Sequence, residues 1–258
     1  LTEPQAGSSL ADITTVAEPA GDGSYRISGQ KIFISAGDHD GVDNVIHLML
    51  AKIQGAPTGV KGISLFIVPQ KRIDQSGNLI PNDIVVSQVY HKMGYRGTPL
   101  TELSIGEKGD CRGYLVAQPH KGLFYMFQMM NEARIGVGMG AIMLGYAGYL
   151  YSLNYARERP QGRLPDGKDP ASTQVPIIEH TDVKRMLLMQ KASVEGAFDL
   201  GLYSARLVDD AHTAESDEER RNAGELLDLL TPIVKGWCTE VAQEVPSLGV
   251  QVYGGMGY

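Results

Sequence analysis

The sequence predicts an α+β fold, in which an antiparallel β-barrel or sandwich is followed by an antiparallel helical bundle. Two observations support this prediction. In the first part of the chain, short segments rich in Val, Ile, Tyr and Phe alternate with turns that contain Gly, Asp and Pro. In the second part, apolar residues recur at helical spacing over much longer stretches. We therefore expect a β domain over residues 1–117 and a helical domain over residues 118–258.

The strands of the predicted β domain are bounded by turn residues. They cover residues 24–28, 31–35, 44–52, 62–69 and 83–90. The strands over residues 24–28 and 31–35 read as two pieces joined at Ser28-Gly29, because a Ser-Gly pair is typical of a turn. A longer excursion over residues 71–83 separates the last two strands.

Three long helices are predicted in the second domain, over residues 122–157, 181–211 and 223–245. The second has an apolar face at helical spacing, formed by Val183, Met186, Leu187, Gln190, Val194, Ala197 and Leu200. Charged residues 215–221 predict a solvated helix start, and Pro232 lies early enough in the third helix to kink or restart it. A polar, turn-rich loop over residues 163–170 connects the first two helices.

The composition narrows the classes of partner. A net charge of -7 argues against nucleic acid or an anionic membrane as the main partner. It still allows an anionic cofactor, because a local group of Arg and Gly residues can bind phosphate on an acidic protein. Cys111 and Cys238 have no CxxC spacing, which argues against a zinc site or a disulfide framework and favours a reducing compartment.

The apolar stretch over residues 137–153 needs a separate interpretation, because a long apolar stretch can also be a membrane span. It is short for a membrane span, it is flanked by Arg134 and Arg157, and Ser152 interrupts it. We interpret it as a core helix and expect no membrane partner.

Several short motifs carry ligand-binding chemistry. Residues 2–8 (TEPQAGS) form a turn with hydroxyls at both ends, and Gly7 lets the backbone approach a ligand closely. Such a loop can offer N–H and O–H donors to an electron-rich ring or a phosphate, although alone it is equally an ordinary Pro/Gly loop. It is followed by residues 29–37 (GQKIFISAG), 93–98 (MGYRGT), 131–134 (NEAR), 156–159 (ARER) and 251–258 (QVYGGMGY).

These motifs, in this order, resemble those of the acyl-CoA dehydrogenase flavoprotein family. The resemblance implies an FAD enzyme that oxidises the Cα–Cβ bond of an acyl-CoA thioester to a trans-2-enoyl-CoA. It also implies an electron-transfer flavoprotein as electron acceptor and a homodimer or homotetramer as the assembly. We expect a cytoplasmic bacterial enzyme, with the mitochondrial matrix as the alternative location, and no nucleic-acid partner.

The resemblance also assigns expected site residues, position by position. The flavin-ring side is expected to contain Leu1, Thr2, Gly7, Ser8, Phe33 and Ser35. The pyrophosphate and adenosine of an FAD held by a neighbouring subunit are expected at Arg159, Gln251, Gly254 and Gly255. The substrate side is expected to contain Ser8, Thr98, Asn131 and Arg134. Phe33 stands where the family often has Trp, and the alternatives are a core aromatic for Phe33 and a surface ion pair for Arg134.

No catalytic base can be assigned in this chain. In most of the family the base is a Glu beyond the Gly-Gly-x-Gly turn, and this sequence ends at Tyr258. In a minority the base directly precedes the substrate Arg, but that position is Ala133 here. Glu132 is one residue away, which on a helix turns a side chain by about 100°. We expect a fragment without the N-terminal helical domain and the C-terminal end, and without activity by itself.

Related functions remain as alternatives. An acyl-CoA oxidase or a nitroalkane-oxidase-like flavoenzyme would use the same scaffold and pass electrons to O₂. The DNA-alkylation-response branch would be expected to carry a basic patch, and no dense Lys/Arg cluster is present in the sequence. The excursion over residues 71–83 and the polar loop ending at residue 170 resemble the larger bacterial members. This branch includes 3-methylmercaptopropionyl-CoA dehydrogenase.

Overall fold

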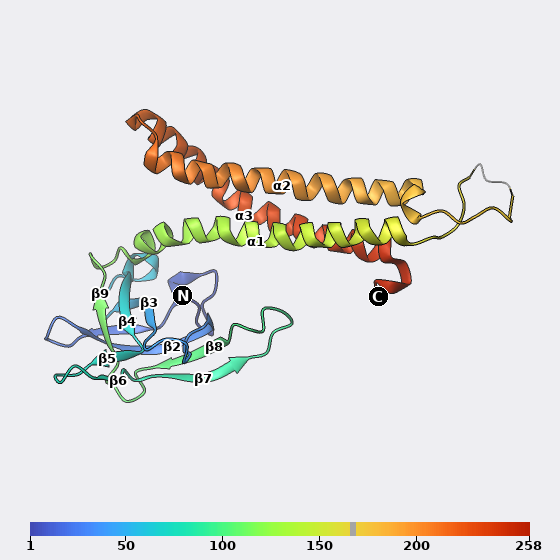
Figure 1. Cartoon of the computed structure of the whole chain (residues 1–258). Coiled ribbons are helices and arrows are strands. Elements are labelled where there is room, and N and C mark those ends of the chain that lie inside the picture. Colours follow the sequence, from blue (N-terminus) through green and yellow to red (C-terminus); the bar gives the residue numbers. More distant parts are fainter. Residues whose placement is uncertain (166–168) are drawn as a thin grey trace. The chain divides into compact units, whose positions relative to one another are not determined.

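The computed structural model describes residues 1–165 and 169–258, so part of the predicted loop over residues 163–170 lies outside the described residues. The chain forms two compact units, Leu1–Gln128 and Met129–Tyr258 (Figure 1). The first unit is built on a β-sheet and the second on long helices, which confirms the predicted α+β class. The units divide inside the first long helix, whereas the predicted domain boundary falls in the turn before that helix.

The first unit is a small barrel with a two-stranded extension. Its strands are β1 Val16–Pro19, β2 Tyr25–Ser35, β3 Ile46–Ile53, β4 Ile63–Pro69, β5 Lys71–Ile73, β6 Leu79–Pro81, β7 Ile84–Tyr90, β8 Leu100–Ile105 and β9 Arg112–Leu115. The sheet closes on itself because β1 pairs with both β2 and β3, and the ring continues through β4 and β9 back to β2. Among the described strands, neighbours pair antiparallel except for β1 with β3, which is parallel.

Strand β2 connects the barrel to its extension. Its first residues pair with β1 and β9, and residues 29–35 pair with β8, which in turn pairs with β7. The prediction of two pieces joined at Ser28-Gly29 is therefore wrong. Gly29 is needed for close approach, since a Cβ there would lie 2.6 Å from the Thr15 hydroxyl oxygen.

Five strands were not predicted as strands from the sequence, namely β1, β5, β6, β8 and β9. Each is short and is held by pairing with neighbouring strands, so its local pattern alone is weak. The excursion over residues 71–83 contains the β5–β6 hairpin, whose turn is closed by the Asp74 carboxylate accepting N–H bonds from Ser76 and Asn78. The barrel core is apolar and is made by Ala17, Ile27, Met49, Ala51, Phe66, Val68, Ile84, Leu103, Ile105 and Cys111.

The second unit contains the greater part of α1 Gly122–Glu158, followed by α2 Thr181–Thr213 and α3 Asp217–Tyr253. Successive helices run antiparallel (Figure 1). The apolar face predicted for the second helix is confirmed for most of its members, with Met186, Leu187, Gln190, Val194 and Ala197 buried.

Helix α3 is longer than predicted at both ends. It begins within the charged run, where Ser216 and Glu219 form a capping box: the Glu219 N–H donates to Ser216 Oγ, and the Ser216 N–H donates to the Glu219 carboxylate. It continues through Pro232 and Pro246, so it does not restart at Pro232. Buried Val234 and Cys238 follow directly, and their packing against the other helices outweighs the loss of one helical N–H donor.

Glycine lets α1 lie close to α3 within the second unit. A Cβ at Gly138 would lie 3.1 Å from Val234 Cγ1, and one at Gly145 would lie 3.4 Å from Ala242 Cα. This packing explains why the apolar stretch over residues 137–153 forms a core helix. Among the described residues, no helix combines the length and apolar character that a membrane crossing requires.

Candidate functional site

The loop over residues 2–8 is fixed by one buried carboxylate. Glu3 and Ala6 exchange backbone hydrogen bonds of 2.9 and 3.1 Å, which closes the loop on itself. The Glu3 side chain turns inward and is 2% exposed. Its two oxygens accept hydrogen bonds from the backbone N–H and the hydroxyl of both Thr14 and Thr15. The start of the loop is therefore attached to the segment before β1.

Lys31 on β2 completes this buried cluster. Its Nζ donates to Glu3 Oε1 at 2.7 Å and to the Leu50 carbonyl on β3 at 2.8 Å, and the residue is 2% exposed. Burial acts to raise the pKa of Glu3, but hydrogen bonds from Lys31, Thr14 and Thr15 outweigh it and lower that pKa to about 2. Burial also lowers the pKa of Lys31, against the opposing effect of the Glu3 carboxylate.

A β-bulge directly after Lys31 turns Phe33 to the surface. The register of β2 against β8 shifts between Lys31 and Ile34, and Phe33 has a φ of 56°. Phe33 is 54% exposed, and its ring packs against that of Tyr90, with ring centroids 4.9 Å apart. Phe33 is therefore not a core aromatic. A bulky residue in the left-handed region is strained, and such strain is typical of functional sites.

Two backbone hydrogen bonds bring other predicted site residues of this unit to β2. The Ile32 N–H donates to the Thr2 carbonyl at 3.0 Å, which places the loop beside β2. The Ala36 N–H donates to the Pro99 carbonyl at 2.8 Å, which brings the segment containing Thr98 to the end of the same strand.

Side-chain donors remain available on this surface. The hydroxyls of four predicted site residues make no hydrogen bond to any residue that the structure describes: Thr2, Ser8, Ser35 and Thr98. A Cβ at Gly7 would meet nothing within 4 Å, so the backbone there is open to a ligand. Leu1 is partly buried beside Thr2. An exposed ring and unpaired hydroxyls form a surface suited to a flat polar ligand.

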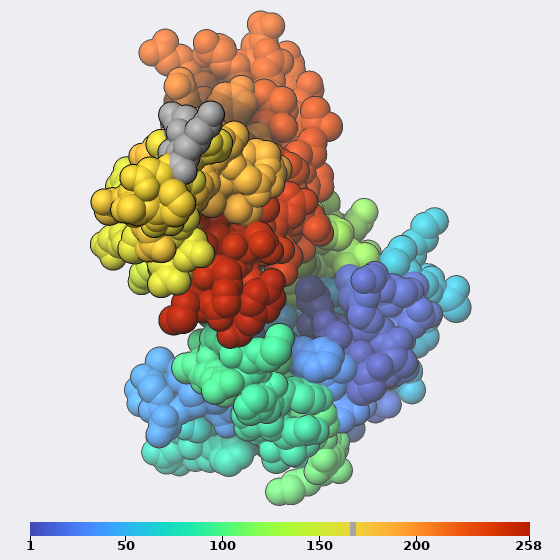
Figure 2. Space-filling model, turned by 90° about the vertical axis from the view of Figure 1, so that its right-hand side faces the viewer, coloured from blue at the N-terminus to red at the C-terminus, as the bar shows by residue number. Residues whose placement is uncertain are grey.

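The second unit contains a pocket of about 310 Å³ at the end of α3. It is lined by Tyr155, Arg159, Gln161, Ile177, Val252, Tyr253, Gly254 and Gly255. Figure 2 shows the end of α3 in red beside the yellow segment that follows α1. Tyr155 and Tyr253 stack with ring centroids 4.3 Å apart, and this contact joins the two segments.

Arg159 is the cation of this pocket. The Arg159 N–H donates to the Tyr155 carbonyl, and the Arg159 carbonyl accepts from the Ile177 N–H. Its guanidinium pairs with no group in the described parts of the chain. A guanidinium without a carboxylate partner is suited to a phosphate. Arg159, Gly254 and Gly255 of the predicted set line the pocket together, whereas Gln251 is exposed on the last turn of α3 and does not.

The substrate-side residues predicted on α1 lie one turn apart. Arg134 donates to the Asn131 side-chain oxygen at 3.4 Å, so the two side chains share one face of the helix. Glu132 is exposed, and Ala133 occupies the position next to Arg134. This part of α1 presents an amide and a guanidinium and no carboxylate in the position expected of a base.

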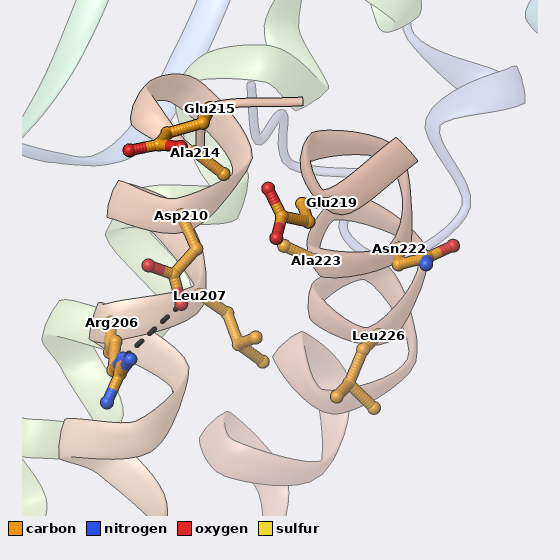
Figure 3. A pocket seen from close by; sticks show the side chains of 9 residues that line it. All are labelled: Arg206, Leu207, Asp210, Ala214, Glu215, Glu219, Asn222, Ala223 and Leu226. Atoms are coloured by element: carbon orange, nitrogen blue, oxygen red, sulfur yellow. Dashed lines mark hydrogen bonds and ion pairs between the residues drawn. The ribbon is translucent and has the colours of Figure 1, made fainter. Parts of the chain in front are cut away.

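A larger pocket, of about 510 Å³, lies at the turn between α2 and α3 (Figure 3). Two of its three lining carboxylates already have structural partners: Asp210 pairs with Arg206 at 3.3 Å, and Glu219 belongs to the capping box of α3. Within residues 1–165 and 169–258, no group of three or more His, Cys, Asp and Glu side chains could hold a metal ion. We therefore interpret this pocket as a consequence of the helix turn.

The comparison with known families agrees with this arrangement. The profile for the acyl-CoA dehydrogenase middle domain matches residues 1–107, and the profile for the C-terminal domain of the same family matches residues 120–258. The chain belongs to the acyl-CoA dehydrogenase family, as the motifs predicted. Members of this family are FAD-dependent flavoproteins.

Relatives of known function are similar over the whole chain. The 3-methylmercaptopropionyl-CoA dehydrogenase of Ruegeria pomeroyi, a member of the predicted branch, is 44% identical. The broad-specificity linear acyl-CoA dehydrogenase FadE5 of Mycobacterium tuberculosis is 39% identical. In each case the alignment covers 100% of this chain and 43% of the relative, so the chain spans less than half of their length.

Solved structures share the fold. ACDH-11 of Caenorhabditis elegans, solved in complex with C11-CoA, has a TM-score of 0.79 and 25% identity, and the match covers 100% of this chain and 40% of that one. Butyryl-CoA dehydrogenase of Megasphaera elsdenii has a TM-score of 0.76 at 24% identity, with 57% of that chain covered. The latter supports the fold alone.

Four residues with structural roles in these surfaces were not singled out from the sequence. Glu3 and Lys31 lie inside the quoted motifs, and a Lys on the inward face of a strand is a signal of buried pairing. Tyr155 and Tyr253 flank the quoted residues of the Arg159 pocket, but stacking between distant segments leaves no local pattern.

Proposed function

We propose that the chain is the flavin- and acyl-CoA-binding part of an acyl-CoA dehydrogenase that oxidises the Cα–Cβ bond of a thioester. The observation that carries this proposal is the surface around Phe33, where an exposed, strained aromatic lies among hydroxyls without protein partners. The unpaired guanidinium of Arg159 in its pocket supports the same cofactor, because FAD combines a flat ring with a pyrophosphate.

Each group then has a role that its chemistry supports. FAD, when bound, supplies the ring that accepts the electrons of the reaction. Thr2 and Ser35 would donate hydrogen bonds to the edge of the ring, and Phe33 would pack against its face. Gly7 and Ser8 would line the approach of the thioester, together with Leu1 and Thr98.

The charged and amide groups of the second unit would bind the phosphates and the substrate arm. Arg134 and Asn131 would hold the CoA part of the substrate by hydrogen bonds. Arg159, Gly254 and Gly255 would hold the pyrophosphate and adenosine of an FAD whose ring lies in a second copy of the chain, with Gln251 at the edge. No side chain of this chain is assigned the proton transfer, because Ala133 cannot accept a proton and Glu132 is exposed on α1.

The relatives suggest the class of substrate and the electron acceptor. Their names include dehydrogenases of butyryl-CoA, of linear acyl-CoA and of 3-methylmercaptopropionyl-CoA. We infer a short or linear acyl-CoA as substrate and an electron-transfer flavoprotein as acceptor. An oxidase or a nitroalkane-oxidase-like enzyme that uses O₂ is the alternative on the same scaffold.

The proposal is tested by titrating the purified chain with FAD and following the quenching of flavin fluorescence. We expect binding by the wild-type chain and about tenfold weaker binding by Phe33→Ala, since aromatic contacts contribute about 0.5–1.5 kcal/mol beyond the area they bury. Arg159→Met should weaken binding by a similar or larger factor because it removes a charged phosphate contact.

Val89→Ala is the matched control, because Val89 is an exposed apolar residue on neighbouring β7 that belongs to neither surface. It should bind FAD as the wild type does. Equal affinity for wild type and Phe33→Ala would contradict the assignment of the ring surface. Anaerobic addition of acyl-CoA to a longer protein that contains this chain, followed by O₂ or the flavoprotein acceptor, separates dehydrogenase from oxidase.

A further inference from the structure

We propose that the buried Glu3–Lys31 pair is a positioning device for the flavin-facing surface, which holds the loop over residues 2–8 in register with β2. This inference rests on the flavin role proposed above for Thr2, Ser8 and Phe33. Both side chains are buried. The pair would act through the loop and the strand, which carry Thr2, Ser8 and Phe33.

The first argument is the position of the pair in the chain. Lys31 holds the Glu3 carboxylate from inside the barrel, and the next residue, Ile32, donates its N–H to the Thr2 carbonyl. The loop is therefore attached to β2 at two consecutive residues, one through a side chain and one through the backbone. The residue after these is Phe33, whose orientation is set by the bulge.

The second argument is the number of elements that meet at the pair. Lys31 also donates to the Leu50 carbonyl on β3, and Glu3 accepts from Thr14 and Thr15 before β1. The loop is thus located relative to three strands of the closed barrel at once. Ligand-binding groups need placement to within about 0.5 Å, which a loop held only at its ends does not provide.

The third argument concerns free energy. Desolvation of two buried charges offsets most of their attraction, so apolar residues of similar volume often give equal or greater stability. Glu3 and Lys31 are each only 2% exposed, and they lie next to a core that is otherwise apolar. An apolar pair would serve stability as well, but it would not fix the direction of the loop. Directional hydrogen bonds do fix it.

The test compares three properties in one double variant, Glu3→Gln with Lys31→Met, which removes both charges and keeps the side-chain volumes. Hydrogen exchange of the Ile32 and Ala6 amides reports the loop, FAD titration reports the surface, and urea unfolding reports stability. We expect the unfolding midpoint to stay near that of the wild type. Protection of both amides and the affinity for FAD should each fall by about tenfold or more.

The matched control is Arg72→Met with Asp110→Asn, which removes a partly exposed ion pair of the same unit away from the loop. It should leave amide protection and FAD affinity unchanged. Wild-type protection and affinity in the Glu3–Lys31 double variant would overturn the inference. The inference would also be overturned if the control variant lost stability and lost FAD affinity in proportion, because affinity would then follow stability alone. A wild-type chain that binds no FAD would refute the proposed function, while the amide protection would still decide whether the pair positions the loop.

Discussion

The side chains of β2 around the bulge differ sharply in environment although they are close in sequence. Lys31 is buried with a carboxylate partner, and Phe33, which alternation would place on the same inward face, is exposed. The register shift after Lys31 is the cause, because an extra residue in one strand reverses the facing of those that follow. A single bulge therefore separates a structural residue from a ligand-binding candidate.

Glu3 predicts a pH dependence of stability. Its pKa falls from 4.5 to about 2 on folding, so the unfolded chain binds more protons between these values. The contribution of Glu3 is complete above pH 4.5 and is lost as the pH falls toward 2. From the size of the shift it amounts to about 3 kcal/mol.

Urea unfolding of the wild type and Glu3→Gln over this pH range measures the effect. The free-energy difference between the two proteins should be constant near neutral pH and shrink toward pH 2, where the wild-type carboxylate becomes protonated. Asp74 provides a comparison: hydrogen bonds from the Asn78 and Ser76 N–H groups also lower its pKa, but it lies in a partly exposed surface turn, so Asp74→Asn should change the profile less than Glu3→Gln does. A difference that does not vary with pH would contradict the prediction.

Helix α1 is the element in which individual glycines have different roles. Gly138 faces Val234, and an added Cβ would lie 3.2 Å from the Val234 carbonyl oxygen. A Cβ at Gly140 would meet nothing within 4 Å. The same residue type is thus required for packing at one position and is replaceable two residues later.

Gly138→Val should destabilise the helical unit by about 1–3 kcal/mol, because the branched side chain would separate α1 from the backbone of α3. Gly140→Ala is the matched control and should be stabilising by about 0.5–1 kcal/mol, since Ala favours the helix. Thermal unfolding followed by circular dichroism measures both. Similar midpoints for the two variants would show that the close approach of α1 and α3 is not required.

At the scale of the whole molecule, the two surfaces proposed for FAD lie in different compact units of the chain. We propose that they act on one FAD only across a pair of chains, with the ring on one copy and the pyrophosphate on the other. Binding of FAD should then promote dimerisation, and the thermal midpoint should rise with both FAD and protein concentration.

Sedimentation velocity with and without FAD tests this prediction. The wild type should shift toward the dimer when FAD is added, and Arg159→Met should shift less at the same FAD concentration. Glu215→Gln is a control in the pocket at the α2–α3 turn, which has no proposed ligand. A monomer that binds one FAD with full affinity would refute the shared site.

Addition of acyl-CoA should leave the flavin of this chain oxidised, because the chain contains no assigned base.

The sequence by itself determined the α+β class, the long helices and the family, because these depend on periodicity and on motifs of adjacent residues. It also predicted ligand-binding roles for Phe33, Ser8 and Arg159, and these stay predictions. Only the tertiary structure decided that β2 is continuous, that Lys31 is paired with Glu3, and that the bulge exposes Phe33. The Arg159 pocket likewise needs Tyr253 from the far end of the second unit. The physical reason is that burial, register and pairing are set by partners distant in sequence, which local patterns do not contain.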